Sequence, residues 1–232
     1  MILAVETATL ATSVALLRGE DLVAEWTHVD RTPHSERLLP AIDALLQGAG
    51  VTIGQVDAFA VSAGPGSFTG LRIGIATVKG LAFGSERPVA AVSTLAALAL
   101  GGADGAAPVA ALLDARRGEV YAAVFGPNGA RLAADAVLTP DALAGRLAPG
   151  TRVVVGEGAG PAAAALARRL GAGVCLLGPS SGLARAHAVG VLGARILAHG
   201  EGVAAALVAP RYVRRAEAEV RRTGERFEPK AL

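Results

Sequence analysis

The sequence predicts an α/β protein made of two lobes of similar construction. Apolar residues account for 52% of the 232 residues but aromatic residues for only 3%, so Ala, Val, Leu and Ile must build the core, which suits layered sheets and helices. Strand-like runs followed by alternating helix-like and strand-like segments occur twice along the chain. Between the two series, residues 101–108 are crowded with Gly and Pro and carry no apolar periodicity, as in a linker. We therefore expect an N-terminal lobe at 1–106 and a smaller C-terminal lobe with a charged tail at 107–232.

The N-terminal lobe should begin with three consecutive strands. Apolar runs at 2–7, 13–18 and 22–29 are separated by turn-forming residues, which predicts a meander that leads into a mixed sheet. A helix follows, because apolar residues recur at helical spacing, at Leu38, Leu39, Ile42, Leu45, Leu46 and Ala49. Pro40 would disrupt a helix interior, so we expect the helix to begin near Ser35 or Glu36. The other elements expected in this lobe are strands at 57–64 and 88–93 and helices at 71–83 and 94–100.

The C-terminal lobe repeats the order. Strand-like runs at 109–115 and 120–125 lie on either side of Arg116, Arg117 and Gly118, which indicates a pair of strands. Thr139 followed by Pro140 is typical of a helix start. The other elements expected in this lobe are helices at 139–147, 161–170 and 183–199 and strands at 152–155 and 174–177.

Charge and cysteine content limit the class of protein. The net charge of +2 is a mild excess and does not indicate a dedicated nucleic-acid binder. Cys175 is the single cysteine, so no intrachain disulfide can form, which fits a reducing compartment. The most apolar segment, 88–103, is shorter than the roughly 20 residues that a membrane span needs. We therefore expect a cytoplasmic protein with no membrane partner.

The stretch GPGSFTGLR at 64–72 joins a predicted strand to a predicted helix. Free amides at a helix N-terminus bind anions, so a phosphate cradle is one interpretation. A tight turn that needs Gly for its geometry is the other, and it is favoured because the order of a P-loop is absent. The loop GEGAG at 156–160 is a second Gly-rich turn, and its spacing is not that of a dinucleotide-binding fingerprint.

The helix expected at 71–83 is apolar on nearly every side. A helix of this kind must be covered on every side, either inside its own domain or by another subunit. Gly70, Gly74 and Gly80 would permit the close approach of a second helix. A metal site is not indicated, because no two of the four histidines, at 28, 34, 187 and 199, have the spacing of a helical His pair.

Five segments together resemble the bacterial TsaB family, which acts in tRNA threonylcarbamoyladenosine biosynthesis and belongs to the glycoprotease-like proteins. They are ILAVETAT at 2–9, HSERLLP at 34–40, GPGSFTGLR at 64–72, DARRGEVY at 114–121 and PRYVR at 210–214. The resemblance covers nearly the whole chain, and its most specific part is 64–72. It implies the actin/hexokinase-like ATPase fold, with two related lobes whose mixed sheets are flanked by helices.

The resemblance also implies a function in a complex. The chain would be a non-catalytic paralogue of a TsaD-like catalytic subunit and would pair with it, and a TsaE-like ATPase would join the pair. The complex would transfer a threonylcarbamoyl group to the adenosine beside the anticodon, so tRNA would be reached through the complex. ATP and metal are expected on the partner subunits and not on this chain, and the isolated chain could form a homodimer.

Two departures from the family's catalytic relatives argue against an activity of this chain's own. Those relatives carry a His-x-x-x-His metal motif after the strand that matches 88–93, where this chain reads VSTLA at 92–96. In the first phosphate loop of the fold an acidic residue is followed by Gly, whereas Glu6 is followed by Thr7. The apolar helices are instead expected to contact the partner, through Leu38, Ile42, Leu45, Gly70, Leu71, Gly74, Ile75 and Val78.

Alternative functions remain open. A small-molecule phosphotransferase of the same fold would bind ATP between the lobes, and the weak candidates for nucleotide contacts are Glu6, Thr7, Asp114, Gly156 and Gly158. A simple RNA-binding module would show a steep salt dependence of tRNA affinity by this chain alone. The missing ligands disfavour a metallopeptidase.

Overall fold

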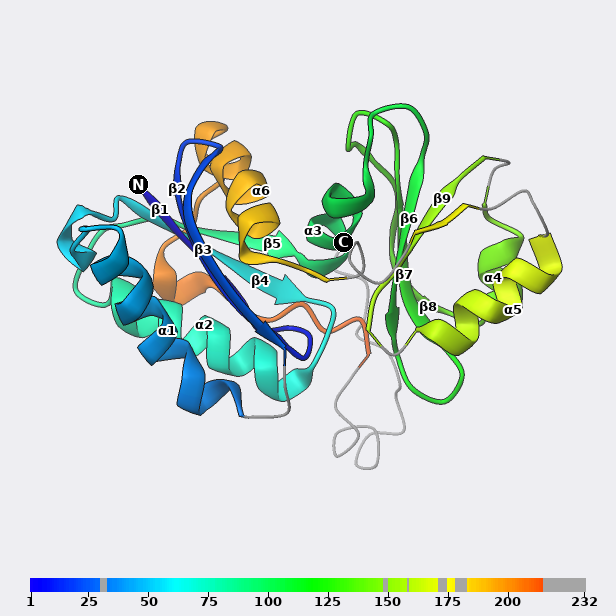
Figure 1. Ribbon diagram of the computed structural model, residues 1–232, viewed down its shortest axis with the longest axis horizontal. Helices are drawn as coiled ribbons and strands as arrows, with labels where there is room; N and C mark the ends of the chain where they lie inside the picture. Colours follow the sequence, from blue (N-terminus) through cyan, green and yellow to red (C-terminus); the bar gives the residue numbers. More distant parts are fainter. Residues whose placement is uncertain (30–32, 148–149, 158, 171–174, 178–182, 215–232) are drawn as a thin grey trace.

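The computed structural model describes residues 1–29, 33–147, 150–157, 159–170, 175–177 and 183–214. The chain forms two lobes that lie side by side, each built on a five-stranded sheet (Figure 1). The α/β class predicted from the sequence is therefore confirmed. The part of the expected charged tail at 215–232 lies outside the described residues.

The N-terminal lobe has a mixed sheet with strand order β3-β2-β1-β4-β5. The three strands expected at the start of the chain, β1 to β3, form an antiparallel meander. β4 then runs parallel to β1, and β5 runs parallel to β4. The strands are β1 (Ile2–Glu6), β2 (Ala11–Arg18), β3 (Asp21–Val29), β4 (Ala58–Gly64) and β5 (Val89–Ser93).

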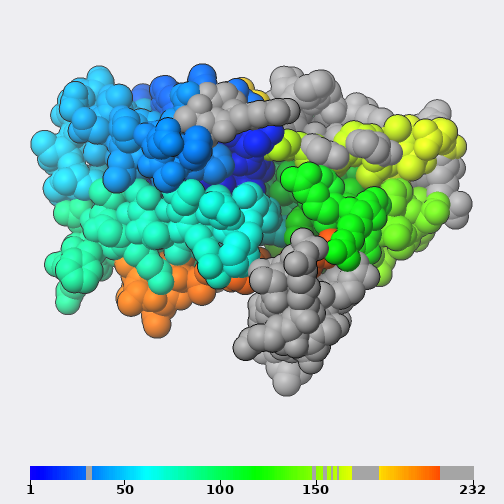
Figure 2. Space-filling view, turned by 90° about the horizontal axis from the view of Figure 1, so that it is seen from below, coloured from blue at the N-terminus to red at the C-terminus, as the bar shows by residue number. Residues whose placement is uncertain are grey.

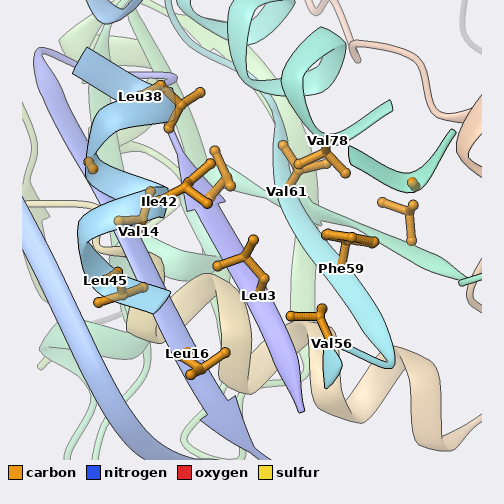
Figure 3. Close-up of a cluster of buried hydrophobic side chains, with 14 of the residues drawn as sticks. Leu3, Val14, Leu16, Leu38, Ile42, Leu45, Val56, Phe59, Val61 and Val78 are labelled. Atoms are coloured by element: carbon orange, nitrogen blue, oxygen red, sulfur yellow. The ribbon is translucent and has the colours of Figure 1, made fainter. Parts of the chain in front are cut away.

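Helices cover both faces of this sheet. On one face lie α1 (His34–Gly48) and α2 (Phe68–Ala82), and on the other lies α6 (Ala186–Ala198) (Figure 1). Alternation along β1 sends Leu3 toward α1 and α2 and Ala4 toward α6. The close-up of the face that α1 and α2 cover shows side chains of both helices packed on the strands (Figure 3).

The C-terminal lobe repeats this construction with strand order β10-β9-β6-β7-β8. Its first three strands are again antiparallel neighbours, and the last two run parallel to the first. The strands are β6 (Val109–Asp114), β7 (Val120–Phe125), β8 (Arg131–Leu138), β9 (Arg152–Val155) and β10 (Cys175–Leu177). The helices α4 (Pro140–Ala144) and α5 (Gly160–Leu170) contact each other, and α3 (Thr94–Gly102) packs between the lobes against β6 and β7.

One strand was missing from the sequence-based prediction. β8 lies at the edge of the second sheet, and most of its residues are exposed or only partly buried. Arg131 and Asp135 pair with each other on it, and Ala occupies two of the three positions between them, so the apolar alternation of a half-buried strand is absent.

The C-terminal boundary of the predicted lobes needs a correction. The cut near 106 falls between the two sheets, but the chain returns to the first lobe with α6. The helix packs on β1, β2, β4 and β5. Side chains of the first lobe also satisfy amides at its start, since Ala186 N donates to Ser13 Oγ at 2.9 Å and His187 N donates to Glu25 Oε1 at 2.9 Å. Residues 107–232 therefore do not form one separate lobe.

Candidate functional site

The Gly-rich stretch that stood out in the sequence packs against the loop between β1 and β2. A Cβ atom added at Gly70 would lie 1.9 Å from Thr7 O, and one added at Gly66 would lie 2.3 Å from Ala8 O. Thr7 Oγ1 donates a hydrogen bond to Gly70 O at 2.8 Å, and Ser67 N donates one to Ala8 O at 2.7 Å. The glycines are therefore required for close contact within the chain, as the tight-turn interpretation predicts.

Glu6 holds this loop from the inside of the lobe. Its side chain is fully buried, accepts a hydrogen bond from Ala8 N at 2.6 Å and accepts another from the hydroxyl of Ser62. Burial raises the pKa of the Glu6 carboxyl to about 7, although both hydrogen bonds act in the opposite direction. The residue is thus bonded to its own loop and has no surface to offer a ligand.

His34 has a role that the sequence analysis missed. Its Nε2 donates to Thr9 O at 3.0 Å, because a carbonyl can only accept, and in the neutral ring its Nδ1 accepts from the Thr12 hydroxyl at 2.7 Å. The imidazole therefore ties the beginning of α1 to the β1–β2 loop. No spacing of residues in the sequence signals such a contact.

The junction of the two lobes brings together the segments proposed for nucleotide binding. Glu157, in the turn after β9, accepts a hydrogen bond from Leu10 N through its carboxylate and one from Asp114 N through its carbonyl at 3.3 Å. Asp114 is itself bonded to the backbone amide and the guanidinium of Arg116, at 2.7 and 3.2 Å. Gly158 lies outside the described residues.

These residues do not fit a nucleotide phosphate. Phosphate cradles use free backbone amides, but Ala8 N and Leu10 N in this loop already donate to carboxylates. Gly156 gives no room either, since an added Cβ would lie 2.6 Å from Leu112 O. Glu6 and Thr7 are both buried within the first lobe. The arrangement therefore does not support the phosphotransferase alternative.

The residues expected to contact a partner are placed differently from the prediction. All eight of them are buried: Leu38, Ile42, Leu45, Gly70, Leu71, Gly74, Ile75 and Val78. The six that are not glycine belong to the core of the first lobe. Leu38, Ile42 and Leu45 point from α1 toward the strands, and Val78 does so from α2 (Figure 3). Gly74 lies in close contact with Thr7 of the same chain, because a Cβ added at Gly74 would be 2.3 Å from Thr7 Oγ1. Helical periodicity identified an apolar stripe correctly, but this stripe faces the sheet.

The opposite sides of the same helices are exposed and poor in charge. On α1, Leu39 is 54% exposed, and an added Cβ at Gly80 of α2 would meet nothing within 4 Å. Just beyond α2, Phe83 is 89% exposed. Figure 2 shows the two helices next to each other on one face of the molecule. We call this region the α1–α2 surface; its exposed residues include Leu39, Pro40, Asp43, Ala44, Gln47, Thr69, Arg72, Ala76, Gly80 and Phe83.

The segment 210–214 joins two further motifs that the sequence analysis singled out. Arg211 N donates to Ala63 O at 2.6 Å beside the Gly-rich turn. The Tyr212 ring stacks on Phe68 with centroids 5.0 Å apart, and its hydroxyl accepts from Arg72 Nε at 3.0 Å. Arg214 donates to Ala115 O and pairs with Glu119 in the second lobe. Segments that are distant in the sequence therefore meet at one place.

Two kinds of feature are absent from the described part of the chain. No group of three or more His, Cys, Asp or Glu side chains in it is arranged to hold a metal ion. No helix in it is both long and apolar enough to cross a membrane.

Comparison with known proteins points to one family. The family model described as tRNA N6-adenosine threonylcarbamoyltransferase matches residues 28–169. The chain is 44% identical over 126 residues to the Escherichia coli tRNA threonylcarbamoyladenosine biosynthesis protein TsaB, a match that covers 53% of this chain and 54% of that protein. The match thus spans about half the length of this curated relative. The solved structure of YeaZ from Pseudomonas aeruginosa is 38% identical, with a TM-score of 0.76, and the alignment covers 91% of this chain and 98% of that one.

A more distant likeness concerns the fold alone. The activator of 2-hydroxyisocaproyl-CoA dehydratase from Clostridium difficile is 11% identical and superposes with a TM-score of 0.51 over 86% of this chain. The actin/hexokinase-like ATPase fold expected from the sequence is confirmed by this class of structural neighbour.

Proposed function

This chain belongs to the TsaB (YeaZ) family, and from that premise we propose that it is a non-catalytic subunit of the complex that makes threonylcarbamoyladenosine in tRNA. In this proposal it binds a TsaD-like catalytic subunit, and a TsaE-like ATPase completes the assembly. The complex transfers the threonylcarbamoyl group to the adenosine beside the anticodon. ATP and metal are bound by the partner subunits, and the complex works in the cytoplasm.

The observation that carries the proposal for this chain is the α1–α2 surface. On α2, the exposed positions Thr69, Arg72, Ala76 and Gly80 follow one another at intervals of three or four residues, so they lie along one side of the helix. Small residues along a helix let the backbone of a second helix come close. Phe83, beyond the end of α2, offers an apolar side chain that a partner would bury.

The partner proposed for this surface is the pair of corresponding helices of the TsaD-like subunit. A related chain with the same fold carries helices at the same places, so the two surfaces can meet about a pseudo-twofold axis, as in isologous interfaces. The same geometry lets two copies of this chain pair when the partner is absent. We therefore expect a homodimer that the catalytic subunit displaces.

Size-exclusion chromatography with light scattering tests the proposal directly. The chain, the TsaD-like subunit and their mixture should give a one-to-one complex that replaces any homodimer. The variant Ala76→Glu places a charge at the centre of the α1–α2 surface and should weaken the complex by at least about tenfold, since an unpaired charge is costly in an interface. Ala164→Glu, at an exposed position of α5, is the matched control.

The outcomes separate the function from the surface. Two unchanged peaks in the wild-type mixture would contradict the proposed function. A complex that forms equally well with Ala76→Glu would leave the function standing but would show that another surface binds the partner.

A further inference from the structure

The turn between β6 and β7 has a backbone conformation that is costly for its sequence. Arg116 and Arg117 have φ angles of 65° and 58°, and Gly118 follows with φ 75°. Residues other than Gly, Asn and Asp rarely adopt this left-handed region, because Cβ then approaches the following carbonyl. Glu119 N donates to Arg116 O at 3.1 Å, so Arg117 and Gly118 are the central residues of a tight hairpin turn. Asn and Gly are the residues that such turns favour.

Several bonds hold the strained turn in place. Arg116 N donates to Asp114 Oδ1 at 2.7 Å, and Ala115 N donates to Glu119 O at 3.0 Å. Arg214, from the segment that ties the two lobes together, bonds to Ala115 O and pairs with Glu119. A strained turn that its surroundings fix so firmly is more typical of a functional site than of a connecting loop.

The turn also presents its positive charge to solvent. The Arg116 side chain is 87% exposed, although its guanidinium lies 3.2 Å from the Asp114 carboxylate. Arg211, in the segment whose Arg214 is bonded to the turn, is exposed as well. The carboxylates next to the turn are those of Asp114, Glu119 and Glu157, and each of them is bonded within the chain.

The rings of Phe68 and Tyr212, the second of which belongs to the same segment as Arg214, contact each other, and Phe68 also contacts Arg72. Its guanidinium carbon lies 3.9 Å from the centre of the Phe68 ring, and the other contact of that ring is with Tyr212. The rings therefore fix Arg72 on the α2 side, and what the turn offers a partner is charge held on a rigid support. Guanidinium groups in such positions match the geometry of phosphate oxygens.

We propose that the arginine turn, residues 116–118, together with Arg211, binds the phosphate backbone of tRNA in the assembled complex. This inference rests on the proposed function, because that function brings tRNA to the complex. RNA is favoured over a protein partner because the turn offers arginine and glycine without an apolar anchor of the kind found at the centres of protein interfaces.

The test exchanges both strained arginines for asparagine, which tolerates the left-handed region. Binding of a fluorescein-labelled tRNA that reads codons beginning with adenosine is followed by anisotropy, with the complex of this chain and its TsaD-like partner. We expect Arg116→Asn with Arg117→Asn to weaken tRNA binding by about fivefold or more and to reduce the slope of log K against log salt by about one for each arginine. The midpoint of thermal unfolding should stay the same or rise, because the strain in the turn is relieved.

A matched double variant controls for the loss of two charges. Arg18→Asn with Arg168→Asn removes exposed arginines from the far end of β2 and from α5, and it should leave tRNA affinity unchanged. Equal affinities for the turn variant and the wild type would overturn the inference. The inference would also be overturned if the turn variant showed both a lower tRNA affinity and a lower midpoint of thermal unfolding. A turn variant that no longer bound the TsaE-like ATPase but still bound tRNA would overturn it as well.

Failure of the proposed function can be recognised separately. If the wild-type chain does not assemble with the TsaD-like subunit, the proposed function is contradicted. The same comparison of variants, made with the isolated chain, then decides whether the turn binds RNA.

Discussion

Glu6 is a carboxyl group without access to water, and its ionisation therefore costs folding free energy. Burial raises its pKa to about 7, whereas the ordinary value is 4.5. Between these two pH values the folded chain holds a proton that the unfolded chain has already released. The folded state binds more protons in this window, so the free energy of unfolding falls as pH rises through it and levels off above about pH 7.

We expect Glu6→Gln to remove this part of the pH dependence. A shift of this size corresponds to about 3 kcal/mol between the two plateaus. The variant should keep the hydrogen bond from Ala8 N, and its urea unfolding should gain stability relative to the wild type as pH increases from about 4.5 to about 7. Glu36→Gln, at an exposed position of α1, is the control. A difference between Glu6→Gln and the wild type that does not change with pH would contradict this account of Glu6.

At the scale of the element, α2 has glycines on both of its sides, and their surroundings are opposite. Gly74 faces inward, where an added Cβ would lie 2.3 Å from Thr7 Oγ1. Gly80 faces outward, with open space around it. The first glycine permits close packing within the chain, while the second has no contact in the chain by itself and lowers the stability of its helix.

Matched substitutions by alanine should therefore act in opposite directions. Gly74→Ala forces Thr7 and the β1–β2 loop to move, and we expect it to lower the free energy of unfolding by roughly 1–3 kcal/mol. Gly80→Ala should raise it by up to about 1 kcal/mol through helix propensity. Chemical denaturation of the two variants measures both effects. Equal effects of the two substitutions would show that Gly74 is not needed for packing.

The elements of the fold were largely predictable because their periodicities are local properties of the sequence. The helix at α2 was expected from 71 but begins at Phe68, because the Ser67 side chain caps it by accepting a hydrogen bond from Gly70 N at 3.2 Å. β8 was missed because it is an exposed edge strand without apolar alternation. The candidate interface residues were misplaced, since Leu71 and Ile75 reveal an apolar side of the helix but not whether a sheet or a partner covers it.

At the scale of the whole molecule, the sequence did not show that the chain returns to its first sheet. α6 lies so close to this sheet that an added Cβ at Gly190 would be 2.2 Å from Leu17, and one at Gly193 would be 2.5 Å from Ala60. A helix of this kind reveals its apolar side in the sequence, but the sheet that it will cover depends on contacts between residues more than 100 positions apart. The segment 210–214 then crosses back to the second lobe, so the two lobes are tied at several points.

This topology predicts which pieces of the chain can fold. Residues 1–106 alone would leave the α6 side of the first sheet uncovered, including Ala4, Leu17, Ala60 and Val92, which are almost fully buried in the whole chain. We expect this fragment to aggregate or remain unfolded, because so much apolar surface would face water. A chain in which residues 107–182 are replaced by a short Gly-Ser linker should instead fold, since α3 and α6 are in contact and a short linker can join them.

Circular dichroism and thermal unfolding show whether each of the two proteins is folded. A cooperatively folded 1–106 fragment would contradict the assignment of α6 to the first lobe, whereas a folded linker protein would identify the first lobe as the autonomous unit and the second as an insertion into it.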